Sequence, residues 1–267
     1  MIYFVGAGPG DVDLITVKGR KLLEQADVVI YAGSLVWDAH LRYCNATCTT
    51  YNSAGMTLED VLKVMSDAEQ AGKMVVRLHT GDPTLYGAIR EQMAALEEQR
   101  IPYEIIPGVS SFTASCAAVR REFTLPDVSQ TVIITRLEGR TPVPEAEDLA
   151  LLASHTCSMA IFLSVKNIET VVEKLRRGYQ RDDVPVAVVY KATWPDQRII
   201  RGTLADIAAK VHEAGIQKFA QILVGDFLGN EFERSLLYHP EFTHEFRKKR
   251  DTAETRRRRE NTCRENT

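Results

Sequence analysis

Glycine, proline, aspartate and serine gather in three short segments of the 267-residue chain: Gly6–Asp11, Thr80–Pro83 and Pro107–Ser111. Each segment follows a short apolar run with the composition of a buried strand. Glycine lets the backbone approach a bound molecule closely, and backbone N–H groups or a carboxylate in such turns can hold its polar groups. In an open α/β sheet, ligands bind beyond the carboxyl ends of the strands. The three segments therefore predict a shared binding site for a small molecule.

The first segment, Gly-Ala-Gly-Pro-Gly-Asp, differs from the turn that binds dinucleotides. That turn has the spacing G-x-G-x-x-G, and Pro9 lacks an N–H that a phosphate would use. The acidic residue that contacts the ribose should end the second strand, whereas Asp27 begins it. A nicotinamide-dependent oxidoreductase is therefore disfavoured.

Two interpretations are open for the polar side chains of the other two segments. Asp82 could accept hydrogen bonds from a ligand, or it could cap the helix that follows. Ser110 or Ser111 could likewise cap the next helix, whose small residues would also let a ligand lie close to the backbone. The residue types suit both roles.

Short strands that alternate with amphipathic helices must position these segments. One helix is predicted to start after a cap at Thr57 and to end at Gly72, because apolar residues recur between them at helical spacing. Continuous apolar strands between such helices indicate a sheet buried on both faces. The predicted strands are Ile2–Val5, Val28–Tyr31, Met74–Leu78, Tyr103–Ile106, Thr131–Thr135, Met159–Leu163, Val186–Tyr190 and Gln221–Val224.

The pattern predicts an α/β fold of two αβα domains with mainly parallel or mixed sheets. The first domain comprises residues 1–120 and the second residues 121–230, because the strand–helix pattern begins afresh near Arg120–Asp127. Residues 231–267 form a C-terminal extension that is basic and almost wholly polar from about Arg247. We expect this tail to be disordered, since it has too little apolar surface to fold. RNA binding by the tail is the alternative, but no aromatic residues lie between its arginines to stack on bases.

Composition is that of an ordinary globular protein and disfavours several classes of function. A net charge of −3 gives no overall attraction to nucleic acid or to an anionic membrane. No apolar run approaches the roughly 20 residues that a membrane-spanning helix needs, and the start of the chain does not resemble a signal peptide. The five cysteines are scattered without a CxxC pair, so we expect reduced thiols and no protein-bound metal. These features predict a cytoplasmic protein.

In their order and separation, the three glycine-containing segments resemble the three loops with which the tetrapyrrole methylase family binds S-adenosylmethionine. Further segments resemble the branch of that family that methylates ring carbon C11, in which Thr80 stands where many other members carry glycine. The resemblance covers about residues 1–230. The further segments are Ala54–Met56, His79–Pro83, Tyr86–Ile89, Thr135–Pro144 and Tyr190–Pro195.

The resemblance implies methyl transfer from S-adenosylmethionine to a ring carbon of a cobalamin-precursor tetrapyrrole. It also implies that the cosubstrate lies in a cleft between the two domains and that the enzyme is a homodimer. Methylation of another tetrapyrrole position is the alternative within the family. By resemblance, the contacts to the cosubstrate come from Pro9, Thr80, Gly81, Asp82, Leu85, Ser110, Ser111, Leu163, Ala192 and Ala220.

Such a substrate carries several carboxylates, so its binding site calls for arginine or lysine. Arg136, Arg140 and Lys191 are the candidates. The alternative for these cations is a surface salt-bridge network, for example with Glu138. The sequence does not decide whether the substrate contains cobalt.

A proton must leave the substrate during or after methylation. Solvent can accept it, and so can a side chain with a suitable pKa within hydrogen-bonding reach. The candidate acceptors are His79, Asp82, Tyr86 and Glu138.

Overall fold

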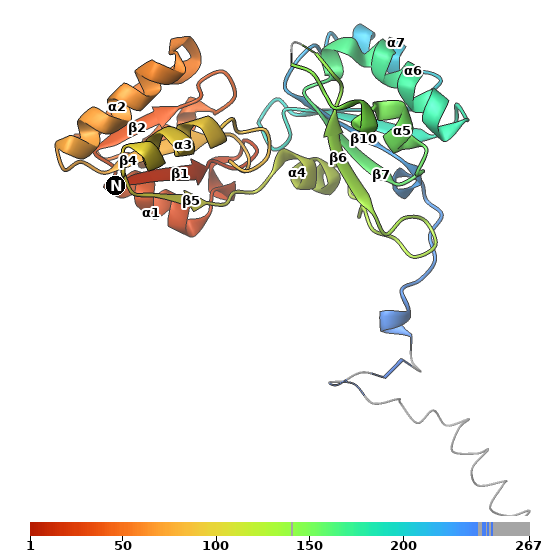
Figure 1. Ribbon diagram of the computed structural model, residues 1–267. Coiled ribbons are helices and arrows are strands. Elements are labelled where there is room, and N and C mark those ends of the chain that lie inside the picture. Colours follow the sequence, from red (N-terminus) through yellow and green to blue (C-terminus); the bar gives the residue numbers. More distant parts are fainter. Residues whose placement is uncertain (140, 240–241, 244, 246, 248–267) are drawn as a thin grey trace, which may run out of the picture.

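Two five-stranded sheets, formed one after the other along the chain, make up the body of the computed structural model (Figure 1). The structure describes residues 1–139, 141–239, 242–243, 245 and 247. Figure 1 shows helices packed on each sheet and helix α4 (Ser111–Ala118) where the chain passes from the first sheet to the second. The predicted α/β class with parallel and mixed sheets is confirmed.

The first sheet is wholly parallel, with the strand order β3-β2-β4-β1-β5. Apolar clusters cover both of its faces, because alternate residues of a strand point to opposite sides: Phe4 belongs to one cluster and Val5 to the other. The strands are β1 (Ile2–Gly6), β2 (Val28–Tyr31), β3 (Thr49–Asn52), β4 (Val75–His79) and β5 (Tyr103–Ile106). The helices are α1 (Val17–Gln25), α2 (Leu58–Gln70) and α3 (Arg90–Glu98).

Helix α2 begins and ends where the sequence predicts. The Thr57 hydroxyl accepts from the N–H of Asp60 at 3.2 Å, and the Asp60 carboxylate accepts from the N–H of Thr57 at 3.0 Å. This reciprocal capping box satisfies two backbone donors at the start of the helix. Gly72, with a φ of 72°, follows the last turn in a left-handed conformation that suits glycine.

The second sheet is mixed, with the strand order β6-β7-β10-β8-β9. Only β6 and β7 pair in parallel; β10 pairs antiparallel with β7 and β8, and β8 pairs antiparallel with β9. The strands are β6 (Val132–Arg136), β7 (Ser158–Phe162), β8 (Pro185–Tyr190), β9 (Arg198–Thr203) and β10 (Ala220–Val224). The helices are α5 (Leu149–Ala153), α6 (Ile168–Tyr179) and α7 (Ile207–Glu213).

Helix α4 packs on the second sheet. Its residues Ala114 and Cys116 share an apolar cluster with Ala187 of β8 and Leu223 of β10. The division of the chain into domains at residue 120 stays a prediction, and this packing favours a division nearer residue 110.

Residues 230–239 leave the second sheet and run away from both sheets (Figure 1). Phe232, Leu236 and Leu237 are exposed there, and Arg247 donates to the Leu237 and His239 carbonyls. The basic tail predicted to be disordered lies, beyond Arg247, outside the described residues. Within the described ranges, no helix is long and apolar enough to span a membrane.

Candidate functional site

The three glycine-containing segments meet beyond the carboxyl ends of β1, β4 and β5, which run in parallel register. The N–H of Gly81 donates to the Gly8 carbonyl at 2.8 Å, and the N–H of Gly8 donates to the Gly81 carbonyl at 3.3 Å. The N–H of Gly108 donates to Asp82 Oδ2 at 2.9 Å. These hydrogen bonds join the three segments into one backbone surface.

Glycine is required where these segments touch. A Cβ on Gly108 would lie 2.1 Å from the Gly81 carbonyl oxygen, and a Cβ on Gly6 would lie 2.6 Å from Gly108 Cα. Both distances are far inside van der Waals contact, and the atoms approached are backbone atoms. The absence of side chains is therefore what lets the three segments pack together.

A cavity of about 370 Å³ opens between this surface and the second sheet. This volume falls within the range of about 300–1,000 Å³ that is usual for small-molecule sites. All ten predicted cosubstrate contacts line the cavity: Pro9, Thr80, Gly81, Asp82, Leu85, Ser110, Ser111, Leu163, Ala192 and Ala220. Their binding role stays a prediction, but the structure brings them together in one place.

Left-handed backbone is concentrated around the cavity. Tyr86, Leu163, Lys191 and Phe219 line it with φ values between 47° and 57°. This conformation is unfavourable for residues other than glycine and persists only where the surrounding structure enforces it. Such residues cluster at binding and active sites, which marks this cavity as the functional site.

Trp194 connects the two sides of the cavity. Its indole Nε1 donates to the Pro9 carbonyl at 2.9 Å, and the neighbouring Thr193 hydroxyl accepts from the N–H of Asp11 at 2.9 Å. The indole also stacks on Trp37, with ring centroids 5.4 Å apart. A Cβ on Gly10 would lie 2.0 Å from the Trp194 ring, so glycine is needed for this contact too.

Asp82 links two of the glycine-containing segments. Its Oδ1 accepts from the N–H of Thr84 at 2.8 Å and from the Thr84 hydroxyl at 2.5 Å, while Oδ2 accepts from Gly108. Helix α3 starts only at Arg90, and its cap residue Ile89 has no capping side chain. The helix-cap interpretation of Asp82 is therefore wrong, and its carboxylate shapes the site instead.

Ser110 also departs from the capping interpretation. It is the N-cap residue of α4, but its side chain makes no capping hydrogen bond. The side chain is buried and lies in the cavity wall. Ser111 begins α4, and its hydroxyl contacts Gln221 Oε1 at 3.1 Å.

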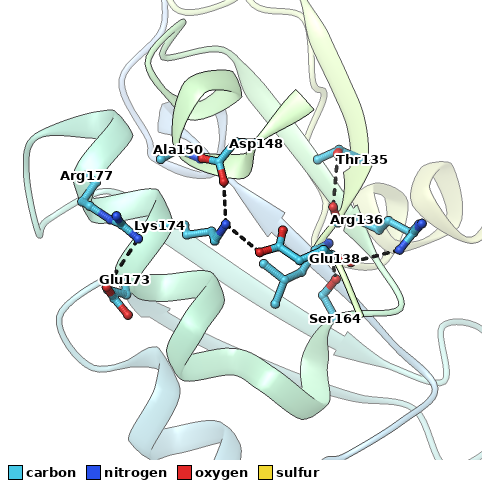
Figure 2. A network of polar contacts seen from close by, with 10 residues as sticks. Thr135, Arg136, Glu138, Asp148, Ala150, Ser164, Glu173, Lys174 and Arg177 are labelled. Carbon is cyan, nitrogen blue, oxygen red and sulfur yellow. Dashed lines mark hydrogen bonds and ion pairs between the residues drawn. The ribbon is translucent and has the colours of Figure 1, made fainter. Parts of the chain in front are cut away.

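The four candidate proton acceptors lie in different environments. Asp82 and Tyr86 line the cavity, whereas His79 and Glu138 do not. Burial raises the pKa of the Tyr86 hydroxyl, which keeps it protonated. Glu138 accepts from Lys174 at 2.8 Å, and this hydrogen bond lowers the pKa of its carboxyl (Figure 2). The geometry does not support His79 or Glu138 as the acceptor.

His79 predicts a pH dependence of stability. Burial, and secondarily the Arg77 charge, lowers the pKa of its imidazole from 6.5 to about 3. Below about pH 6.5 the unfolded chain binds a proton that the folded protein does not, so stability falls by up to about 1.4 kcal/mol per pH unit until the folded pKa is reached. We expect His79→Leu to lose stability less steeply between about pH 6.5 and pH 5 than the wild type. Chemical unfolding at several pH values measures this, and equal slopes in the two proteins would contradict it.

Two of the three predicted substrate-binding cations form hydrogen bonds within the protein. The Arg136 guanidinium donates to the carbonyls of Leu137, Thr141 and Pro142, and so holds its own loop together. Lys191 lines the cavity and donates to Asp196 at 2.6 Å. Arg140 lies outside the described residues. The substrate role of all three stays a prediction.

Five polar residues of the cavity wall were not predicted from the sequence, one of which is the exposed Gln217. Lys166 and Lys218 are exposed at its edge and have no ion-pair partner within the described ranges. Ser115 and Gln221 are buried in the wall. A polar residue inside an otherwise apolar strand, as in Gln221-Ile-Leu-Val, is the signal that could have identified the last of them. Among all the residues that the structure describes, no group of three or more His, Cys, Asp or Glu side chains could hold a metal ion.

Comparison with known proteins agrees with this geometry. The model of the tetrapyrrole (corrin/porphyrin) methylases matches residues 1–208. The cobalt-precorrin-4 C(11)-methyltransferase of Methanocaldococcus jannaschii is 55% identical over 92% of this chain and 96% of its own length. The precorrin-4 C(11)-methyltransferase of Pseudomonas aeruginosa is 49% identical over 92% of this chain and 98% of its own length.

Solved structures show the same fold. The X-ray structure of a cobalt precorrin-4 methyltransferase, a cobalamin biosynthetic enzyme, superposes with a TM-score of 0.84 at 50% identity. The superposed region covers 86% of this chain and 96% of the chain of that structure. The uroporphyrin-III C-methyltransferase of Thermus thermophilus shares the fold at 22% identity, with a TM-score of 0.71 over 85% of this chain and 92% of its own. The chain therefore belongs to the tetrapyrrole (corrin/porphyrin) methylase family.

Proposed function

We propose that this chain transfers the methyl group of S-adenosylmethionine to C11 of precorrin-4 or cobalt-precorrin-4 in cobalamin biosynthesis. One observation carries the proposal: relatives named as C(11)-methyltransferases of these two substrates are 55% and 49% identical to the chain over nearly their whole length. Both forms of the substrate occur in the names of these relatives, and both are part of the proposal.

The cavity suits S-adenosylmethionine. It has the volume of a small-molecule site, and it opens on backbone segments whose close packing a side chain at Gly6 or Gly108 would disrupt. Its wall holds the hydroxyl of Ser115 and the amide of Gln221, each with a buried polar atom that has no partner in the part of the chain that the structure describes. The ten contacts implied by the family all lie around it.

For methyl transfer, the protein must mainly hold the two reactants in the right relative position, and it needs few reactive side chains. S-adenosylmethionine supplies an electrophilic methyl group on a sulfonium. The glycine-containing surface and the Trp194 contact hold the two sides of the cavity in a fixed relation. Holding two reactants at attack distance can contribute about 7–11 kcal/mol to catalysis.

Cations around the cavity suit the carboxylates of the substrate. Lys191 lies in the wall, while Lys166 and Lys218 at the edge have exposed side chains that can reach a large anionic molecule. A proton released from the substrate goes to solvent in this proposal, because Asp82 is engaged by Thr84 and Gly108 and His79 is buried outside the cavity wall. A homodimer in the cytoplasm is part of the same proposal, on the family resemblance and the composition.

Mass spectrometry tests the proposal. The protein is incubated with S-adenosylmethionine and with precorrin-4 or cobalt-precorrin-4 in separate reactions, and we expect one of these substrates to gain a single methyl group. A ¹³C-labelled methyl group then locates the new bond by NMR, and a signal from a carbon other than C11 would favour the alternative position. Calorimetry should show binding of S-adenosylhomocysteine and none of NAD. Failure to methylate either substrate would contradict the proposal.

A further inference from the structure

Two buried polar atoms in the cavity wall have no hydrogen-bond partner among the described residues. Ser115 is 0% exposed and Gln221 is 4% exposed, and both residues line the cavity. These atoms are the Ser115 hydroxyl oxygen and the Gln221 Nε2, and no residue of the described ranges forms a hydrogen bond with either. A buried polar group without a partner costs about 1–3 kcal/mol, so two of them in one cavity need an explanation.

The two side chains belong to adjoining elements. Ser115 lies one turn after Ser111 in α4, and Gln221 lies in β10, on which α4 packs. The Ser111 hydroxyl occupies one end of the Gln221 amide, at 3.1 Å. A hydroxyl can donate or accept, so whichever way the amide is turned, this contact uses one end and leaves the other unsatisfied. The unsatisfied end of the Gln221 amide and the Ser115 hydroxyl therefore lie in the same wall of the cavity.

We infer that Gln221 and Ser115 bind the adenosyl part of the cosubstrate through a neutral polar group, a ring nitrogen, an amino group or a ribose hydroxyl. This inference rests on the proposed function. A neutral group is expected because neither side chain carries a charge to balance a carboxylate or an ammonium in a buried wall. Adenosine is expected over the tetrapyrrole because the cavity, at about 370 Å³, holds a small molecule and not a four-ring macrocycle.

A ligand role and a structural role predict opposite effects on the free protein. Ser115→Ala removes a polar atom that is unsatisfied without ligand, so we expect Tm of the free protein to stay the same or rise. Gln221→Leu removes the unsatisfied end of the amide together with the end that contacts the Ser111 hydroxyl, so we expect its Tm to change little. The dissociation constant for S-adenosylhomocysteine should rise about tenfold in each variant, as for the loss of one hydrogen bond. The KM for the tetrapyrrole should change less than the dissociation constant of the cosubstrate.

Two matched variants serve as controls. The Ser158 hydroxyl donates to the Phe123 carbonyl at 2.7 Å, and the Gln92 amide contacts Arg77 and the Ala88 carbonyl. Both side chains are buried outside the cavity wall with their hydrogen bonds made. We expect Ser158→Ala and Gln92→Leu to lower Tm and to leave the affinity for S-adenosylhomocysteine unchanged.

Ligand analogues show whether the contact is direct. Calorimetry is repeated with S-inosylhomocysteine and with the 3-deaza, 7-deaza, 2′-deoxy and 3′-deoxy forms of S-adenosylhomocysteine, so that each candidate group is altered in one analogue. For the analogue that lacks the contacted group, Gln221→Leu should cost much less affinity than it costs with the parent ligand. A lower Tm with unchanged affinity, or the same loss with every analogue, would overturn the inference and leave the proposed function intact. Failure of the wild-type protein to bind S-adenosylhomocysteine would overturn both.

Discussion

Gly108→Ala is expected to abolish methyl transfer while leaving a folded but less stable protein. The new Cβ would lie 2.1 Å from the Gly81 carbonyl oxygen and 2.9 Å from Gly6 Cα, so it would push the third glycine-containing segment away from the other two. Overpacking of this kind costs about 1–3 kcal/mol of stability. A displacement of about 1 Å at a reacting centre can cost about a hundredfold in rate. We therefore expect loss of S-adenosylhomocysteine binding by calorimetry and at least a hundredfold loss of turnover.

Gly55→Ala is the matched control. A Cβ at this position meets no atom within 4 Å, and the φ of Gly55 is not in the left-handed region. Alanine there should leave affinity unchanged and stabilise the fold by at most about 1 kcal/mol, since it restricts the unfolded chain. Normal binding and turnover in Gly108→Ala would contradict the role given to the three segments.

The sequence predicts the buried part of the fold well. Each of the eight apolar runs coincides with a strand to within one residue at either end, because a strand buried on both faces must be apolar throughout. Two strands escaped prediction, β3 and β9, which lie at sheet edges with exposed or half-exposed residues. Their residues, Thr-Thr-Tyr-Asn and Arg-Ile-Ile-Arg-Gly-Thr, form no apolar run, and only their backbone pairing with β2 and β8 makes them strands.

In the candidate site too, some residues could be placed from the sequence and others could not. Glycine, proline and small residues were assigned to it by type and order, and the ten positions so chosen do surround one cavity. Long polar side chains were harder to place, because their direction depends on neighbours distant in sequence. Arg136 turns to its own loop carbonyls, and Glu138 pairs with Lys174 of α6. Ser115 and Gln221 were placed in a helix and a strand but not in the site, because their polar character was not weighed against the apolar residues around them.

Asp82→Ala is expected to reduce both folding stability and cosubstrate affinity. The substitution removes the acceptor for the Gly108 N–H on one side and for Thr84 on the other. Hydrogen bonds to a charged group contribute about 1.5–3 kcal/mol, so the free energy of unfolding should fall by about 2 kcal/mol. Without the link to Gly108, the second and third segments are no longer held together, and affinity for S-adenosylhomocysteine should fall about tenfold or more.

Two further variants separate the two sides of the carboxylate. Thr84→Val removes only the hydroxyl that bonds Oδ1, so it should cost some stability and little affinity. Asp82→Asn keeps one acceptor oxygen and places an NH₂ group toward either Thr84 or Gly108, where a donor meets a donor. Its affinity should therefore lie near that of Asp82→Ala. Urea unfolding and calorimetry on the three variants decide between the roles. Affinity lost without stability would mean that Asp82 binds the cosubstrate directly, whereas stability lost without affinity would mean that its link to Gly108 does not shape the cavity.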